Sequence, residues 1–299
     1  MASQMGSNGN SFLKLFSDPP PAYAFELSEA GIAFAAVKAA GEVRFQALEP
    51  GVIWASPARE NISQPEALEA GIRAVSPPNG HRKRRTALIL PDYCARVAVL
   101  DFDAFPPAQE EQLALLRFRL KKSVPFDIES AVLSYFAQRS GKGQIEVVAA
   151  VVACEIIARY EAPFRQSGFH PGFITTSSLA ALNMFKPDKV SILAKQSGRT
   201  LSVLVLDGST LKLARCVELE SDRPDEIESI LHPTFAYIED ELKSKPSRVV
   251  TCGFGRETDQ FVAQCESEWG VTVEPLRSRF GTPSGVNAGL LGYLESIGN

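Results

Sequence analysis

The sequence predicts a two-lobed α/β fold in which one order of elements occurs twice. Three strands in a meander, then a helix and a buried strand, are expected over residues 23–90 and again over residues 190–252. Between the two series, residues 96–153 have a different order, strand–helix–strand–strand. Because a repeated supersecondary unit is the mark of an internal duplication, we expect two lobes that face each other across a cleft.

The composition fits a globular protein and excludes several other classes. The chain has 299 residues, of which 45% are hydrophobic and 22% charged, so it is long enough for two lobes. A net charge of −4 gives no reason to expect nucleic-acid binding. No segment has the roughly 18 apolar residues of a membrane span, and no signal peptide is evident. The five cysteines are widely spaced, which favours free thiols in a reducing cytoplasm.

The first lobe is expected over residues 22–92, after a disordered tail at residues 1–21 that is rich in Ser, Gly and Asn. Apolar and β-branched runs predict strands at Tyr23–Leu27, Gly31–Lys38, Val43–Leu48 and Thr86–Leu90. The helix at Gln64–Val75 is predicted by Leu68, Ile72 and Val75, which share one helical face.

An inserted subdomain is expected over residues 93–168, with strands at Arg96–Asp101, Ala131–Arg139 and Ile145–Ala153 and a further helix through Phe164. A helix over Pro107–Lys122 has acidic residues in its first turn and basic residues near its end, as the helix dipole favours. Val124-Pro125-Phe126 ends this helix, because the residue before a proline is disfavoured in helical geometry.

Residues 169–187 are expected to return to the first lobe, and residues 188–284 to form the second. Its predicted strands are Val190–Leu193, Thr200–Asp207, Thr210–Val217, Arg248–Cys252 and Val271–Glu274. Helices are predicted at Arg223–Leu242, with a break near Pro233, and at Glu257–Glu268. Residues 285–299 form a closing helix.

This order of elements resembles the actin-like fold, a duplicated ribonuclease H-like α/β fold. The strand–helix–strand–strand insertion resembles that of the pilus assembly protein PilM and the division protein FtsA. PilM-like chains have a Glu- and Leu-rich helix there that ends in Ile-Pro-Phe. The counterpart here is the segment from Gln109 to Val124-Pro125-Phe126. The cytoplasmic part of the secretion protein GspL shares much of the same plan.

The resemblance implies two phosphate-binding hairpins and an adenosine loop, and all three depart from the usual pattern. In the first hairpin Glu26 stands where an Asp is usual, and Ser28 where a Gly is usual. In the second, Lys195 replaces the Asp and Ser197 the Gly, followed by Gly198. A lysine there repels Mg²⁺, which needs carboxylates nearby.

The adenosine loop is Gly253-Phe254-Gly255, with a bulky residue between the two glycines. These departures favour a pseudo-ATPase without catalytic residues, metal or cofactor. The alternative is that the chain binds ATP or ADP with weak or absent dependence on Mg²⁺. Lys195 and Arg199 would then contact phosphate oxygens directly.

The resemblance also implies a protein partner. In PilM-like proteins, the groove beside the inserted subdomain receives the cytoplasmic N-terminal peptide of the membrane protein PilN. We therefore expect a cytoplasmic scaffold that reaches the inner membrane through the tail of a bitopic partner, and that can form homo-oligomers. Expected partner-binding residues are Leu116, Leu120, Val124, Pro125 and Phe126, although Phe126 also suits the core.

Two other functions stay open from the sequence. One is a nucleotide-dependent actin-like ATPase or kinase, and the other is an FtsA-like protein of cell division or cell shape. The basic run His81–Arg85 is read as a loop, with anionic lipid contact as the alternative. Phe12–Phe16 could pack on the domain or touch a membrane. The three histidines are far apart, which argues against a metal site or a catalytic triad.

Overall fold

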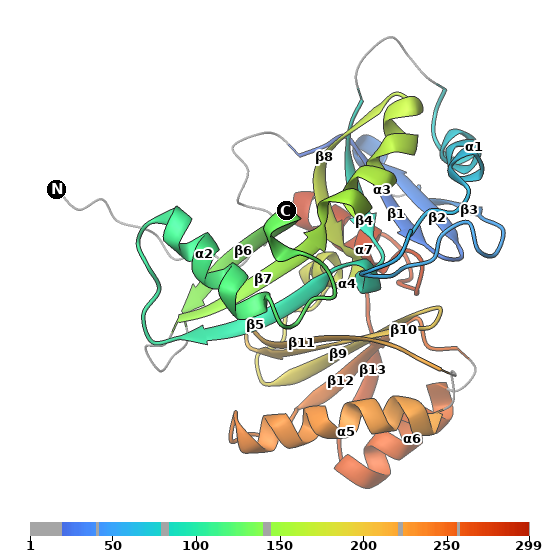
Figure 1. Ribbon diagram of the computed structural model, residues 1–299. Helices are drawn as coiled ribbons and strands as arrows, with labels where there is room; N and C mark the ends of the chain where they lie inside the picture. Colours follow the sequence, from blue (N-terminus) through green and yellow to red (C-terminus); the bar gives the residue numbers. More distant parts are fainter. Residues whose placement is uncertain are drawn as a thin grey trace.

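The computed structural model describes residues 20–39, 42–78, 84–139, 145–220, 224–255 and 258–298, and it has two sheets of matching order. The first is ordered β3-β2-β1-β4-β8 and the second β11-β10-β9-β12-β13, so the same arrangement recurs strand by strand. In each sheet an antiparallel meander is followed by a parallel central pair, β1 with β4 and β9 with β12. Figure 1 shows the two sheets in separate lobes, as the repeated order predicts.

The first lobe is a sheet with helices on both faces. Its strands are β1 (Tyr23–Ser28), β2 (Gly31–Ala36), β3 (Arg44–Ala47), β4 (Arg84–Leu90) and β8 (Phe169–Thr176). On one face, α1 (Pro65–Val75) and α3 (Cys154–Gln166) cover alternate residues such as Phe25 and Leu27. On the other face, α4 (Ser177–Ala181) and α7 (Ala288–Ile297) cover Ala24 and its neighbours. This alternation turns Glu26 towards α7.

The inserted subdomain is a small sheet ordered β5-β7-β6 with one helix across it. Its elements are β5 (Arg96–Phe102), α2 (Gln109–Leu120), β6 (Ala131–Arg139) and β7 (Ile145–Ala153). Leu116 and Leu120 of α2 form one core with the odd-numbered residues of β6 and β7, such as Val151, and with even-numbered residues of β5, such as Phe102. The even-numbered residues of β6 and β7 lie on the opposite face, away from α2.

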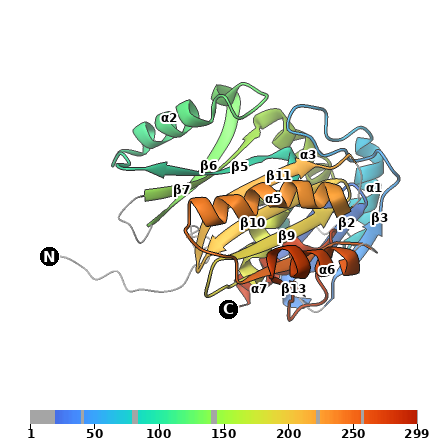
Figure 2. The same cartoon turned by 90° about the horizontal axis from the view of Figure 1, so that it is seen from below.

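The second lobe has its helices on its outer face. Its strands are β9 (Ser191–Ser197), β10 (Thr200–Asp207), β11 (Thr210–Glu218), β12 (Arg248–Cys252) and β13 (Thr272–Pro275). Figure 2 shows α5 (Pro224–Asp240) and α6 (Thr258–Trp269) lying over this sheet. The closing helix α7 leaves this lobe and packs on α4 of the first.

Some predicted elements differ in detail. The described residues also contain four short 3-10 helices: η1 (Val37–Ala39), η2 (Asp92–Cys94), η3 (Ile128–Ser130) and η4 (Leu182–Met184). The predicted break in α5 is wrong, because the helix continues through Pro233, whose missing N–H costs only one bond. The short helix η3 lies between Phe126 and the next strand, β6. The predicted tail up to residue 19, residues 81–83 of the basic run and the turn Ser140–Gly143 lie outside the described residues.

Candidate functional site

The two hairpins predicted to hold phosphate touch each other where the lobes meet. The first turns between β1 and β2, and the second between β9 and β10. A Cβ built on Gly198 would lie 3.7 Å from Oε2 of Glu29, so a carboxylate of one hairpin abuts the tip of the other. The Ser28 hydroxyl donates to the carbonyl of Gly31, within its own hairpin. A carboxylate, which would repel phosphate, therefore lies beside the tip of the second hairpin.

The predicted adenosine loop also packs against the second hairpin. Gly253 has a φ of +78°, and a Cβ built on it would lie 2.0 Å from the carbonyl oxygen of Gln196 and 2.8 Å from Gly285. Phe254 stacks on Phe261 with ring centroids 5.0 Å apart, within the core of the second lobe. The glycine at 253 thus serves a close backbone approach inside the protein.

Glu26 is buried and bonded within the first lobe. Its Oε1 accepts a hydrogen bond from the Ser177 hydroxyl, and its Oε2 accepts one from the backbone N–H of Leu290 at 2.7 Å. Burial raises the pKa of the Glu26 carboxyl, although Lys195 and these hydrogen bonds oppose that rise. Its bonds tie β1 to the start of α7, and both oxygens already have donors.

Lys195 lies inside β9 and crosses between the lobes to an aspartate. Its Nζ is 3.1 Å from Oδ2 of Asp92, and the two side chains are only 1% and 3% exposed. The same Oδ2 accepts from the Ser202 hydroxyl at 2.9 Å, and Oδ1 accepts from the N–H of Ser178 at 2.7 Å. Three donors, from β9, β10 and α4, therefore bond to this carboxylate.

The charges of this pair stabilise each other. Burial alone would raise the pKa of the Asp92 carboxyl, but Lys195 and the Ser178 bonds lower it below its usual range. Burial would likewise lower the pKa of Lys195, but Asp92 and then Glu26 raise it overall. Both groups are therefore charged at neutral pH, as in a buried ion pair with good geometry.

The second predicted phosphate cation, Arg199, is also engaged elsewhere. Its Nε donates to the carbonyl oxygen of Leu219 at 3.0 Å, and its guanidinium lies 3.8 Å from Glu218. Neither of the two pockets described below has Glu26, Ser197, Gly198 or Gly255 in its lining. The donor set at the hairpins therefore does not fit a Mg²⁺–nucleotide.

Sequence reasoning missed Asp92, the residue on which the junction depends. The sign that could have found it is its place: Pro91-Asp92 directly follows the buried strand β4. Polar residues at the carboxyl ends of strands in open α/β sheets are where ligands or interlobe contacts gather. Its partner could not be found, because Lys195 is 103 residues away in the sequence.

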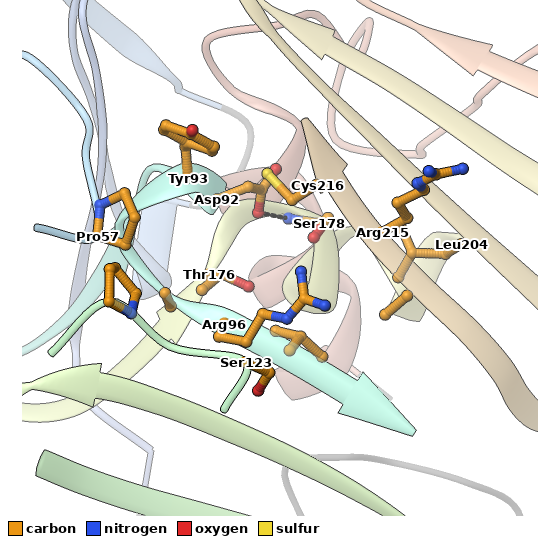
Figure 3. Close-up of a pocket in the computed structure, with 14 residues that line it drawn as sticks. Pro57, Asp92, Tyr93, Arg96, Ser123, Thr176, Ser178, Leu204, Arg215 and Cys216 are labelled. Atoms are coloured by element: carbon orange, nitrogen blue, oxygen red, sulfur yellow. Dashed lines mark hydrogen bonds between the residues drawn. The ribbon is translucent and has the colours of Figure 1, made fainter. Parts of the chain in front are cut away.

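A pocket of about 210 Å³ lies where the first lobe, the inserted subdomain and the second lobe meet. Figure 3 shows its lining, with Asp92 and Ser178 joined by a hydrogen bond and Arg96 beside them. Pro125 of the predicted partner set also lines this pocket. Arg215 directs its guanidinium away, towards the carbonyl of Ile230 in α5.

A larger apolar groove of about 370 Å³ runs between the inserted subdomain and the first lobe. One wall is the even-numbered face of β6 and β7, with cross-strand pairs that include Ser134 with Ala150. The opposite wall is β8, α4 and η4. Its lining includes Val132, Ser134, Phe136, Val148, Ala150, Val152, Phe173, Ile174, Leu179 and Asn183. Val132 is 44% exposed there, a high value for a valine in a sheet.

The predicted partner-binding residues are not in the lining of this groove. Leu116 and Leu120 are residues of α2, and their side chains are buried between this helix and the sheet of the subdomain. Val124 and Phe126 are half-buried against the same core, and Phe126 also contacts the core of the first lobe. Only Pro125 lines a described pocket, the smaller one. Their predicted role in partner binding stays a prediction.

Two further features concern the described residues. They contain no cluster of three or more metal-ligating side chains. Among their helices, none is both long enough and apolar enough to span a bilayer.

Comparison with known proteins identifies the fold. No family model matches the sequence, and no curated protein does. Among solved structures, the chain is similar to a PilM-PilN type IV pilus biogenesis complex, with a TM-score of 0.70 and 16% identity over 94% of this chain and 99% of that one. A Bacteroides thetaiotaomicron protein with the actin-like ATPase fold and unknown function matches at a TM-score of 0.51, with 11% identity over 85% of this chain and 89% of that one. The cytoplasmic domain of EpsL, from the Vibrio cholerae type II secretion system, matches at 0.48, with 16% identity over 77% and 80%. The resemblance to PilM-like proteins of the actin-like fold is thus confirmed at the level of the fold.

Proposed function

We propose that this chain, which has the actin-like fold, is a docking scaffold of a type IV pilus or type II secretion-like assembly. It binds the extended cytoplasmic peptide of a bitopic inner-membrane protein, without hydrolysing ATP. The observation that carries the proposal is the apolar groove between the inserted subdomain and the first lobe. Its support from the comparisons is the overall similarity to the PilM-PilN complex.

The walls of the groove suit an extended peptide. β6 is the outer strand of the order β5-β7-β6, and β8 is the outer strand of the first lobe. Outer strands present backbone donors and acceptors on one side, which an added strand can use. The apolar wall of Val132, Ala150 and Val152 would take alternate side chains of that peptide. Backbone pairing would supply affinity, and the apolar wall would favour peptides with small or branched apolar residues.

The setting of the chain follows from the partner. A scaffold that binds a cytoplasmic tail works on the cytoplasmic face of the inner membrane and is held there through its partner. We propose this peripheral location for the chain, and homo-oligomers within the assembly stay a prediction. The hypotheses of an ATPase or kinase and of a division protein gain no observation here, because the hairpins do not fit a Mg²⁺–nucleotide.

A peptide-binding measurement tests the proposal. Labelled N-terminal peptides of the bitopic membrane proteins encoded beside this gene would be titrated with the full chain, with fluorescence anisotropy as the readout. We expect one of them to bind, and Val132→Glu to weaken binding by about tenfold or more, because a charge would face an apolar wall.

A matched control lies on the other face of the same subdomain. Phe118 in α2 is 76% exposed, and Phe118→Glu changes an apolar residue to the same charge away from the groove. It should leave affinity unchanged. Equal binding by the wild type and Val132→Glu would contradict the groove as the site, and failure of every candidate peptide to bind would contradict the proposal itself.

A further inference from the structure

The resemblance implies a nucleotide in the cleft between the two lobes, whereas here two side chains of opposite charge meet across it. The first hairpin abuts the second at Glu29 and Gly198, and Gly253 packs on Gln196. At the centre, Lys195 stands at the position of the second Asp and is bonded to Asp92. A cation from one lobe and a carboxylate from the other therefore meet where phosphate and metal would be expected.

We propose that the ion pair between Lys195 and Asp92 is a built-in latch that holds the two lobes closed in place of a Mg²⁺–nucleotide. The latch has a donor from each lobe on one carboxylate: Lys195 and Ser202 come from β9 and β10, and the N–H of Ser178 comes from α4. The lobes of this chain thus stay closed whether or not nucleotide is present.

The burial of the latch explains why it acts as one unit. Lys195 is 1% and Asp92 3% exposed in their side chains, so the pair is largely shielded from bulk solvent. Removing one member leaves the other as an uncompensated charge in the interior, which is strongly unfavourable. The arrangement of lowest free energy in the folded protein therefore keeps Lys195 and Asp92 in contact. Because they come from different lobes, it also keeps the two lobes in contact.

Other titratable groups surround the pair. Glu26 lies near enough to act on Lys195, but its two oxygens are bonded to Ser177 and Leu290. The thiols of Cys94, Cys216 and Cys252 also lie close, and burial raises the pKa of each, so they are neutral at physiological pH. Arg96 lines the pocket beside Asp92, but the hydrogen bonds of the Asp92 carboxylate are made with Lys195, Ser202 and Ser178.

The inserted subdomain adds a second link of the same kind. The side chain of Gln138 in β6 bonds to both the N–H and the carbonyl of Leu211, and Lys212 pairs with Glu146 of β7. Opening the cleft would break both links together. This makes the closed arrangement a property of the chain and not of a bound ligand.

The latch is tested by measuring the distance between the two lobes. The measurement uses no peptide, so its outcome is independent of the proposed docking function. Labels would be placed at Glu66→Cys in α1 and Glu239→Cys in α5, in a full chain carrying Cys154→Ser. Both label positions are exposed, and they lie in different lobes. We expect one narrow interlobe distance, unchanged by millimolar Mg-ATP or Mg-ADP, and a broader or longer one in Lys195→Met.

The outcomes decide the proposal in each case. A distance or melting temperature that changes with Mg-ATP in the wild type would overturn it, as would a folded Lys195→Met with the wild-type distance. Should Lys195→Met fail to fold, Ser202→Ala removes a single hydrogen bond to Asp92 and is expected to give a smaller broadening. An unchanged distance in that variant would then overturn the latch.

Discussion

Glu146 of the inserted subdomain and Lys212 of the second lobe form an ion pair across two parts of the chain, with Oε1 and Nζ 2.6 Å apart. The side chains are only 9% and 10% exposed. The pair lies next to the contact of Gln138 with Leu211, so the ion pair joins β7 to β11 and the amide bonds join β6 to β11. A subdomain placed on the first lobe in the chain order is thereby also fastened to the second.

The first prediction concerns this pair. Lys212→Met should lower the free energy of unfolding by about 3 kcal/mol, because it leaves Glu146 as a nearly buried, unpaired charge. Urea unfolding measures the change. Arg73→Met is the matched control, since Arg73 pairs with Glu69 on the exposed side of α1 and should matter by less than about 0.5 kcal/mol. Similar losses in the two variants would contradict the prediction.

The second prediction is a pH dependence. The pKa of Asp92 is lowered in the folded state, mainly through Lys195 once burial is overcome, so the folded protein binds this proton less readily than the unfolded chain. The stabilisation of the fold by the Asp92 carboxylate is therefore complete above the pKa of this group in the unfolded chain, about 3.9. It is lost as the pH falls through the lower pKa of Asp92 in the folded protein. The stability difference between wild type and Asp92→Asn should be large at pH 7 and shrink below about pH 4.

Comparing the two proteins removes the contribution of Glu26, whose pKa is shifted upward and whose effect on stability has the opposite sign. Denaturant unfolding over a series of pH values gives the difference directly. A gap between wild type and variant that stays constant from neutral to acid pH would mean that the Asp92 carboxylate is not the stabilising form.

The third prediction compares two glycines with positive φ. It separates the cost of a steric overlap from the cost of backbone strain alone. Gly253→Ala should destabilise by several kcal/mol, because its Cβ would lie 2.0 Å from the carbonyl oxygen of Gln196. Gly208 has a φ of +57° with nothing within 4 Å, so Gly208→Ala should cost only about 1 kcal/mol of backbone strain. Thermal unfolding compares them, and equal losses would show that strain alone, without the close approach, determines both.

The fourth prediction concerns thiol reactivity. Cys154 is exposed, whereas Cys94, Cys252 and Cys265 are buried, and burial raises the pKa of the last two to about 12. A thiol reagent at neutral pH should modify one cysteine quickly in the native protein and all five after denaturation. Cys154→Ser should abolish the fast phase, and a fast phase that persists in this variant would contradict the assignment.

Local patterns predicted most of the elements, for reasons visible in particular segments. Leu68, Ile72 and Val75 recur at helical spacing, and all three are buried in α1. The run Ile145–Ala153 was predicted as a strand, and it is the central strand of the subdomain sheet. The break at Pro233 failed because a proline removes one hydrogen bond, and the packing of Leu231 and Phe235 in the core outweighs that loss.

The sequence by itself determined the order of elements, the insertion and the departure of three loops from the nucleotide-binding pattern. These are local properties, since period, turn residues and residue type are read within a few positions. Only the tertiary structure decided which residues meet across the cleft and which residues line the groove. Asp92 meets Lys195, and β6 faces β8, across long sequence separations, and such contacts depend on how separate elements pack. Leu116 and Leu120 show the same limit: their apolar character was evident, but only packing shows that they serve the core under α2.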